Sequence, residues 1–465
     1  MSVALRQEKG APVNKRLRRW ITALAAVLVP LGALSLVGTP SANAELTHPR
    51  QAFLRSATGG LFLHWGLRTG PSHNDCAAWE QDVTNGGWKA SYWVQEAQKL
   101  HLQYLVLASF HSRLGYARAW PSQIPGSCST KRDFLGELIT AASKVTVSPG
   151  QKMKVILYMT DDPGHHNEGG TEWMNSSAYS KFKGHTVNLD ARPGFGEFSF
   201  DNFIEVMKKY PDLGGFWIDN ENQYWKDHGL YAQIRKMRPS FTLSNNNTDT
   251  PAFDMMSNEQ KTGMTPPYDM PQKIHTHPPR LIEADYKLPT KGAWWYTSGD
   301  PAVDRKLTIG RFIANAGSTI LSLEAETARV NGTFPPAQQA FNDFADGYFD
   351  KIWESIGNTY GAGYQQPGLK PGRWNNGAFG YVTVSKASPQ TNYIHLIDPP
   401  SGSTLVVRDN GYKVTSVTNL RTKASVSFKQ GNGNLTLTGL GGYDPYDTVF
   451  KVETSGRATA PLGTQ

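Results

Sequence analysis

Short apolar runs alternate with amphipathic stretches between residues 60 and 328. Eight runs have the length of a strand, and a polar or aromatic side chain follows each one. These runs are 61–63, 104–108, 155–159, 215–218, 241–243, 253–256, 293–295 and 319–323. Between them, apolar residues fall on one helical face in 92–101, 134–142, 200–210, 230–237 and 307–316. Eight strands that alternate with helices predict a closed, parallel (β/α)8 barrel.

The pattern changes after residue 361, where a stretch rich in Pro, Gly and Asn begins at 367–377. Seven short strand-like runs with turn signals between them then follow. They are 381–384, 393–397, 404–407, 414–417, 424–427, 435–437 and 448–452. We therefore predict a barrel over 45–361, a C-terminal antiparallel β-sandwich over 362–455 and a flexible tail over 456–465.

The first 44 residues are typical of a secretory signal peptide. Four basic residues between positions 15 and 19 precede an apolar stretch at 20–37, and Ser41-Ala42-Asn43-Ala44 supplies a small-residue cleavage pattern. An uncleaved membrane anchor is the alternative, and the small residues argue against it. No second long apolar run follows, so we expect a secreted, extracellular chain with no membrane partner after cleavage.

Removal of this segment changes the charge of the chain. It holds six basic residues and one acidic residue, so the formal net charge of +8 falls to about +3. No basic run remains to indicate nucleic-acid binding. The chain has 13 Trp residues and 11% aromatic residues. Aromatic rings stack on sugars, which favours a carbohydrate ligand, although Trp is also a good core residue.

Cys76 and Cys128 are the only cysteines. Export places them in an oxidising compartment, so we predict a disulfide between them, with two free buried thiols as the alternative. Neither cysteine has a His or Cys partner at the spacing of metal ligands, and adjacent histidines at 165 and 166 point different ways. The sequence therefore predicts no metal site.

Asp219 follows the apolar run 214–218, directly after a predicted helix end and a Pro-containing turn at 205–212. Parallel barrels present their catalytic groups at the carboxyl ends of strands, which makes Asp219 a candidate catalytic residue. The alternative is an Asp that caps the next helix. Glu221 would share a face with Asp219 if the strand continued, and could then hold the nucleophile or a sugar hydroxyl.

The segment Gly60–Gly66, GLFLHWG, resembles the opening strand of the α-L-fucosidase family of glycoside hydrolases. The similarity continues in the same order along nearly the whole mature chain. The further matching segments are 92–97 with 104–107, 120–122, 133–138, 210–219 and 314–323. The resemblance implies a retaining exo-glycosidase on a (β/α)8 barrel with a C-terminal β-sandwich.

The resemblance to this family implies that Asp219 is the nucleophile. A retaining mechanism also needs a second carboxyl about 5 Å away as acid/base, and the family places it on a downstream loop. Glu259 is the first candidate and Glu283 the second, with a salt-bridge or surface role as the alternative for each. The two carboxyls suffice, so no cofactor is expected.

The resemblance also names residues of the sugar pocket. His64 and His111 would hydrogen-bond sugar hydroxyls, unless they are core histidines. Trp65, Trp295 and Tyr296 would form the apolar wall, with structural packing as the alternative.

Two departures from the family pattern affect the sugar. The usual Lys-His-His-Asp-Gly-Phe motif after the second strand is replaced by 110–116, in which only His111 remains. Asp161-Asp162 replaces the apolar or Trp-containing end of the third strand, so Asp161 either binds a hydroxyl or lies in a solvated loop. We expect a terminal α-L-fucoside or related sugar on an oligosaccharide, polysaccharide or glycoconjugate. The alternative is a carbohydrate-binding protein that has lost turnover.

Overall fold

The computed structural model describes residues 48–164, 170–246, 252–259, 281–361, 380–409 and 411–455. The predicted signal peptide and the predicted C-terminal tail lie outside these ranges. Within them, no helix has both the length and the apolar character needed to cross a membrane.

Eight parallel strands form a closed barrel, as the alternation of strands and helices predicts. They are β1 (Gly59–His64), β2 (Tyr104–Ala108), β5 (Lys154–Thr160), β6 (Gly215–Asp219), β7 (Thr242–Asn246), β8 (Met255–Glu259), β9 (Leu281–Lys287) and β10 (Leu321–Glu326). Around the barrel their order is β1-β10-β9-β8-β7-β6-β5-β2. The carboxyl ends of all eight strands therefore lie at one end of the barrel.

Alternate residues of each strand fill the barrel interior. Phe62, Tyr104, Tyr158 and Trp217 belong to the internal cluster, while Leu61 packs on the opposite side of β1 against the helices. Both faces of each strand are buried, which explains why most of the strands appear in the sequence as continuous apolar runs.

The seventh strand corrects the prediction from sequence. The run 293–295 is not a strand, and β9 lies instead at Leu281–Lys287, where no strand was predicted. Glu283 and Asp285 alternate with apolar residues along β9 and point into the barrel. Their partners, Tyr104 and Trp217 for Glu283 and Ser257 for Asp285, come from other strands, so no local apolar run marks β9.

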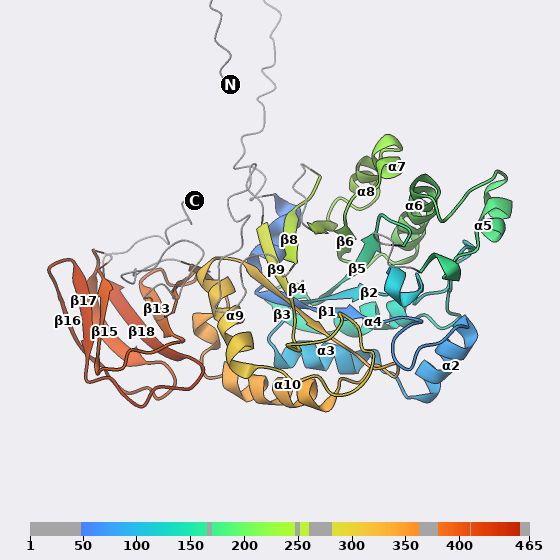
Figure 1. Cartoon of the computed structure of the whole chain (residues 1–465). Helices are drawn as coiled ribbons and strands as arrows, with labels where there is room; N and C mark the ends of the chain where they lie inside the picture. The colour runs from blue at the N-terminus through green and yellow to red at the C-terminus, as the bar shows by residue number, and fades with distance from the viewer. Residues whose placement is uncertain are drawn as a thin grey trace, which may run out of the picture. The chain divides into compact units, whose positions relative to one another are not determined.

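Helices lie outside the strands, with α3, α4 and α10 along one side of the barrel and α6 and α8 along another (Figure 1). The ten α-helices of the described residues are α1 (Ala52–Ser56), α2 (Cys76–Asn85), α3 (Ala90–Lys99), α4 (Phe134–Ala142), α5 (Ser176–Lys183), α6 (Arg192–Lys209), α7 (Gln223–Asp227), α8 (Leu230–Met237), α9 (Arg305–Gly317) and α10 (Pro336–Phe349). The five predicted helices match α3, α4, α6, α8 and α9 within a few residues, except that α6 begins earlier. Helices α2 and α5 lie in segments for which no helix was predicted.

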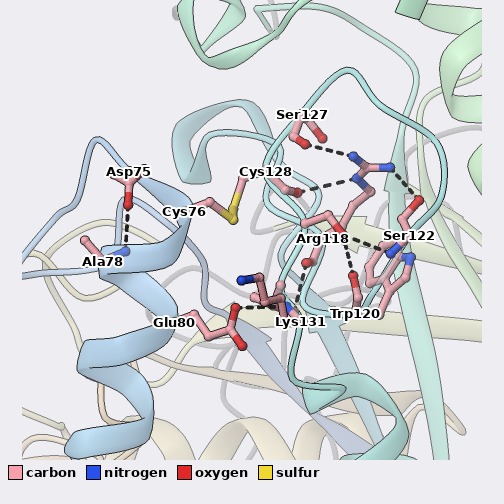
Figure 2. The surroundings of a disulfide bond; sticks show 12 residues. Asp75, Cys76, Ala78, Glu80, Arg118, Trp120, Ser122, Ser127, Cys128 and Lys131 are labelled. Carbon is pink, nitrogen blue, oxygen red and sulfur yellow. Dashed lines mark hydrogen bonds between the residues drawn. A yellow bond between two sulfur atoms is a disulfide. The ribbon is translucent and has the colours of Figure 1, made fainter. Parts of the chain in front are cut away.

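The predicted disulfide joins Cys76, the first residue of α2, to Cys128 in the loop that follows β2 (Figure 2). Arg118 is fully buried inside this loop. Its guanidinium donates hydrogen bonds to Ser122 Oγ at 2.8 Å and to the Ser127 carbonyl at 2.8 Å. Arg118 therefore stabilises the loop from within, while the disulfide anchors it to α2.

The C-terminal strands form the predicted antiparallel β-sandwich. One sheet has the order β11-β12-β13-β18-β15 and the other has the order β14-β17-β16. Their bounds are β11 (Thr359–Gly361), β12 (Val382–Ser385), β13 (Thr391–Leu396), β14 (Thr404–Arg408), β15 (Lys413–Asn419), β16 (Ser427–Gly431), β17 (Asn434–Thr438) and β18 (Thr448–Ser455). Ile394 and Val452 of the first sheet pack with Leu405 and Leu437 of the second in one buried cluster.

The fifth predicted strand of the sandwich is displaced. The run 424–427 makes only an isolated bridge, and β16 begins at its last residue, Ser427. The preceding turn explains the shift. Asn419 Oδ1 accepts hydrogen bonds from the backbone N–H groups of Arg421 and Thr422, and Lys423 has a left-handed φ of 61°. The turn therefore extends to Lys423, and β16 begins only at Ser427.

Candidate active site

Three polar side chains end three neighbouring barrel strands. Asp219 is the last residue of β6, Asn246 the last of β7 and Glu259 the last of β8. These strands are adjacent in the barrel, and the side chain of Asp219 is 8% exposed. The structure thus brings the predicted nucleophile and the first acid/base candidate to the same end of the barrel.

Asn246 connects the two carboxylates. Its Nδ2 donates a hydrogen bond to Asp219 Oδ1 at 3.0 Å and another to Glu259 Oε2 at 3.0 Å. Two oxygens that each lie 3.0 Å from the same nitrogen can be at most about 6 Å apart. The arrangement fixes a short separation between Asp219 and Glu259.

The second oxygen of Asp219 also has a partner. The Tyr158 hydroxyl donates to Asp219 Oδ2 at 2.7 Å. Burial, followed by the neighbouring Asp219 carboxylate, holds the pKa of Tyr158 well above its usual value, so the phenol keeps its proton and remains a donor. Tyr158 stacks on Trp217 with ring centroids 5.5 Å apart. The orientation of Asp219 is therefore set from two sides.

Glu221 faces away from this arrangement. Strand β6 ends at Asp219, and Asn220 has a left-handed φ of 61°, so the i and i+2 relation of a strand does not extend to Glu221. Its carboxylate accepts from the Tyr231 hydroxyl at 2.8 Å and pairs with Lys226 at 3.2 Å.

His64 ends β1 and His111 follows β2 by three residues, and both rings lie near Tyr158, whose hydroxyl donates to Asp219. Their rings are 5.8 Å apart, and each lies against Tyr158. His64 is 4% exposed, and its Nδ1 is buried without a hydrogen-bond partner among the described residues. Burial lowers the pKa of His64 to about 3, so the ring is neutral above that pH and offers one donor and one acceptor.

Aromatic side chains line the two histidines. The ring of Trp294 is 5.5 Å from that of His64, and the ring of Trp295 is 5.8 Å from that of His111. Tyr296 follows them and donates its hydroxyl to the Gly299 carbonyl at 3.2 Å.

The structure places Trp65 elsewhere. It is fully buried outside the barrel, where it packs against Trp79, Trp88 and Trp93. Its indole N–H donates to the Val330 carbonyl at 3.0 Å. No surface of this ring is exposed to contact a sugar.

Asp161 follows β5 and is 1% exposed. Its carboxylate pairs with Arg192, and its backbone carbonyl accepts from Asn222 at 2.7 Å. Burial raises the pKa of Asp161 to about 6, and the Arg192 charge opposes that rise. Asp161 is therefore a buried carboxyl that pairs with Arg192, not a solvated loop residue.

Glu283 lies deeper in the barrel than Glu259. Its Cα pairs with that of Ser257, two residues before the end of β8. It is completely buried and accepts hydrogen bonds from the Tyr104 hydroxyl and from Trp217 Nε1, the latter at 2.9 Å. Burial raises the pKa of Glu283. The structure does not place it beside Asp219.

Asp285 is the strand neighbour of Glu259 in the barrel register. It accepts a hydrogen bond from Ser257 Oγ at 3.0 Å and is 1% exposed. Burial, with Glu259 and Glu283 nearby, raises the pKa of Asp285 well above its usual range.

The sequence did not single out Asn246, Tyr158, Trp294 or Asp285 as site residues. Asn246 lies in a polar run that is typical of a turn, and Tyr158 lies inside an apolar strand. Trp294 was placed in a strand that does not exist. Among the described residues, no three His, Cys, Asp or Glu side chains are arranged to hold a metal ion.

Neither a protein-family model nor a curated protein sequence matches the chain. Solved structures do match. α-L-Fucosidase isoenzyme 1 from Paenibacillus thiaminolyticus is 16% identical with a TM-score of 0.66, and the match covers 88% of this chain and 100% of that one. This chain has the fold of the α-L-fucosidases.

Two further α-L-fucosidase structures agree with this result. A GH29 enzyme from Bacteroides thetaiotaomicron, trapped as a covalent intermediate with 2-fluoro-fucosyl fluoride, is 17% identical with a TM-score of 0.64 over 88% of this chain and 97% of that one. The enzyme from Thermotoga maritima in complex with fucose is 14% identical with a TM-score of 0.61 over 88% and 98%. The barrel and the sandwich are thus matched together.

Proposed function

We propose that the protein is a secreted, retaining exo-glycosidase that hydrolyses a terminal α-L-fucoside or a related sugar. The observation that carries the proposal is that Asp219 and Glu259 each accept a hydrogen bond at 3.0 Å from one amide nitrogen, so the two bonded oxygens are at most about 6 Å apart. Retaining glycosidases use carboxyls about 5–5.5 Å apart, whereas inverting ones leave about 6.5–9.5 Å for a water molecule. The α-L-fucosidases that share the fold support the same class of reaction.

The proposed mechanism gives each carboxyl a role. In the first step Asp219 attacks the anomeric carbon while Glu259 donates its proton to the glycosidic oxygen, and the alcohol leaves. The sugar is then bound to Asp219 through an ester. In the second step Glu259 takes a proton from water, the water oxygen attacks the anomeric carbon, and the Asp219 carboxylate is released. Two inversions give net retention.

The groups around the carboxyls support a hydroxyl-rich neutral substrate. Neutral His64 offers both a donor and an acceptor, and the Trp294 ring beside it is a surface on which a sugar ring can stack. The fucose bound by the Thermotoga maritima enzyme supports the sugar class. Only His111 remains of the family's motif after the second strand, and Asp161 is buried at the end of the third strand. Both departures from the family pattern support a pocket whose shape suits a related sugar.

A screen of aryl glycosides, with the α-L-fucoside among them, tests the proposal on the purified mature chain. We expect Asp219→Ala to lower turnover on the order of 10⁴-fold or more, because the nucleophile is lost. Asp227→Ala, which removes an exposed carboxylate from nearby α7, is the matched control and should keep wild-type turnover. Near-wild-type turnover by Asp219→Ala would contradict the proposal, and glycan binding without turnover would favour a binding protein.

Azide distinguishes the two acid/base candidates. Glu259→Ala should lose activity on poor leaving groups and keep more of it on good ones, and azide should restore its turnover as a glycosyl azide. Glu283→Ala should show no such rescue, because Glu283 is buried below the site. Rescue of Glu283→Ala alone would transfer the role to Glu283.

A further inference from the structure

Asn246 is held rigidly at the centre of the candidate site. It is 3% exposed and ends β7, which pairs with β6 on one side and with β8 on the other. These two strands carry Asp219 and Glu259. The amide and the two carboxyls that it contacts therefore lie at the carboxyl ends of three adjacent barrel strands.

The orientation of this amide follows from its neighbours. Both contacts of Nδ2 are carboxylate oxygens, which accept hydrogen bonds. With the amide reversed, the carbonyl oxygen would face two other acceptors, which is repulsive. The amide nitrogen has two hydrogens, which is enough for one hydrogen bond to each carboxylate.

We propose that Asn246 is a positioning residue that sets the separation and orientation of Asp219 and Glu259, an inference that rests on the proposed function. Without the amide, two carboxylates whose oxygens are at most about 6 Å apart repel each other with no donor between them. Glu259 is the one that can move, because Tyr158 still holds the other oxygen of Asp219. A shift of about 1 Å in a catalytic group costs on the order of 10²-fold in rate.

A purely structural role at the end of β7 would give different results. Asn246→Ala removes both hydrogen bonds, whereas Asn246→Asp keeps the shape and replaces the donor with a carboxyl. That carboxyl donates only while protonated. Asn245→Asp introduces the same charge at the preceding residue, whose side chain is on the opposite face of β7, and is the matched control.

We expect Asn246→Ala to lower kcat on the order of 10²-fold with a smaller change in KM, because the substrate still binds. Asn246→Asp should lower kcat at neutral pH by more than Asn246→Ala does. Its kcat should recover relative to that of wild type as the pH falls, because protonation of the new carboxyl restores a hydrogen-bond donor. Asn245→Asp should keep the shape of the wild-type pH profile. Losses of only a few-fold in both Asn246 variants, or the same pH-dependent loss in Asn245→Asp, would overturn the proposal.

A crystal structure of full-length Asn246→Ala gives a readout that does not depend on activity. We expect the Glu259 carboxylate to move away from Asp219. An unchanged separation would overturn the proposal even if activity fell. If the wild-type protein hydrolysed no glycoside, the proposed function would fail, and this structure would still decide whether Asn246 positions the carboxyls.

Discussion

His64 should make the protein less stable in acid by a predictable amount. Burial lowers its pKa in the folded protein to about 3, while an unfolded histidine has a pKa of 6.5. Below pH 6.5 the unfolded chain therefore binds a proton that the folded chain does not. The contribution of His64 to stability is complete above pH 6.5 and falls as the pH drops toward 3. At pH 5 the 1.5-unit interval corresponds to a loss of about 2 kcal/mol.

Urea unfolding of wild type, His64→Gln and His64→Asn at pH 8 and pH 5 measures this loss. Gln and Asn do not titrate, so each variant should become more stable relative to wild type by about 2 kcal/mol on going from pH 8 to pH 5. The intrinsic cost of each substitution cancels in that comparison. Ser109→Ala, a buried change without a titrating group, should follow wild type. Identical pH dependence in wild type and both His64 variants would refute the reasoning.

The buried carboxyl of Glu324 and the disulfide give two further, independent predictions. Glu324 is a fully buried residue of β10, and burial raises its pKa to about 8 from 4.5. Its contribution to stability is therefore complete below pH 4.5 and is lost as the pH rises through 8. Denaturant unfolding should show Glu324→Gln gaining about 3 kcal/mol relative to wild type between pH 4 and pH 7, and a constant difference would contradict this. The disulfide Cys76–Cys128 closes a loop with a sequence separation of 52. Replacing both cysteines with Ser should lower the free energy of unfolding by about 4 kcal/mol, measured without reductant, and an unchanged value would show that the loop is held by Arg118 alone.

The sequence was sufficient for most of the barrel because seven of its strands contain or overlap a short apolar run that helical patterns separate from the next. Strand β9 could not be predicted because Glu283 and Asp285 occupy its inward positions. Their hydrogen-bond partners come from β2, β6 and β8. Those partners are far away in the sequence. No periodicity inside residues 281–287 could reveal them, so the nearest apolar run, 293–295, was chosen instead.

The site was predictable where it depends on the end of a strand and not where it depends on a contact between strands. Asp219 follows an apolar run, and the family resemblance pointed to Glu259. Asn246, which connects the two carboxylates, lies in a run of polar residues that is typical of a turn. Trp294 and Trp295 are adjacent in the sequence, and only the fold shows that each lies against a different histidine.

Covalent trapping tests the central claim most directly. The mature protein would be incubated with the 2-fluoro glycosyl fluoride of the sugar that it hydrolyses, starting with the fucosyl compound, and its peptides mapped by mass spectrometry. We predict one glycosyl group per chain, on the peptide that contains Asp219, and none in Asp219→Asn. Attachment to another residue, or product of inverted configuration from an untrapped enzyme, would contradict a retaining mechanism through Asp219.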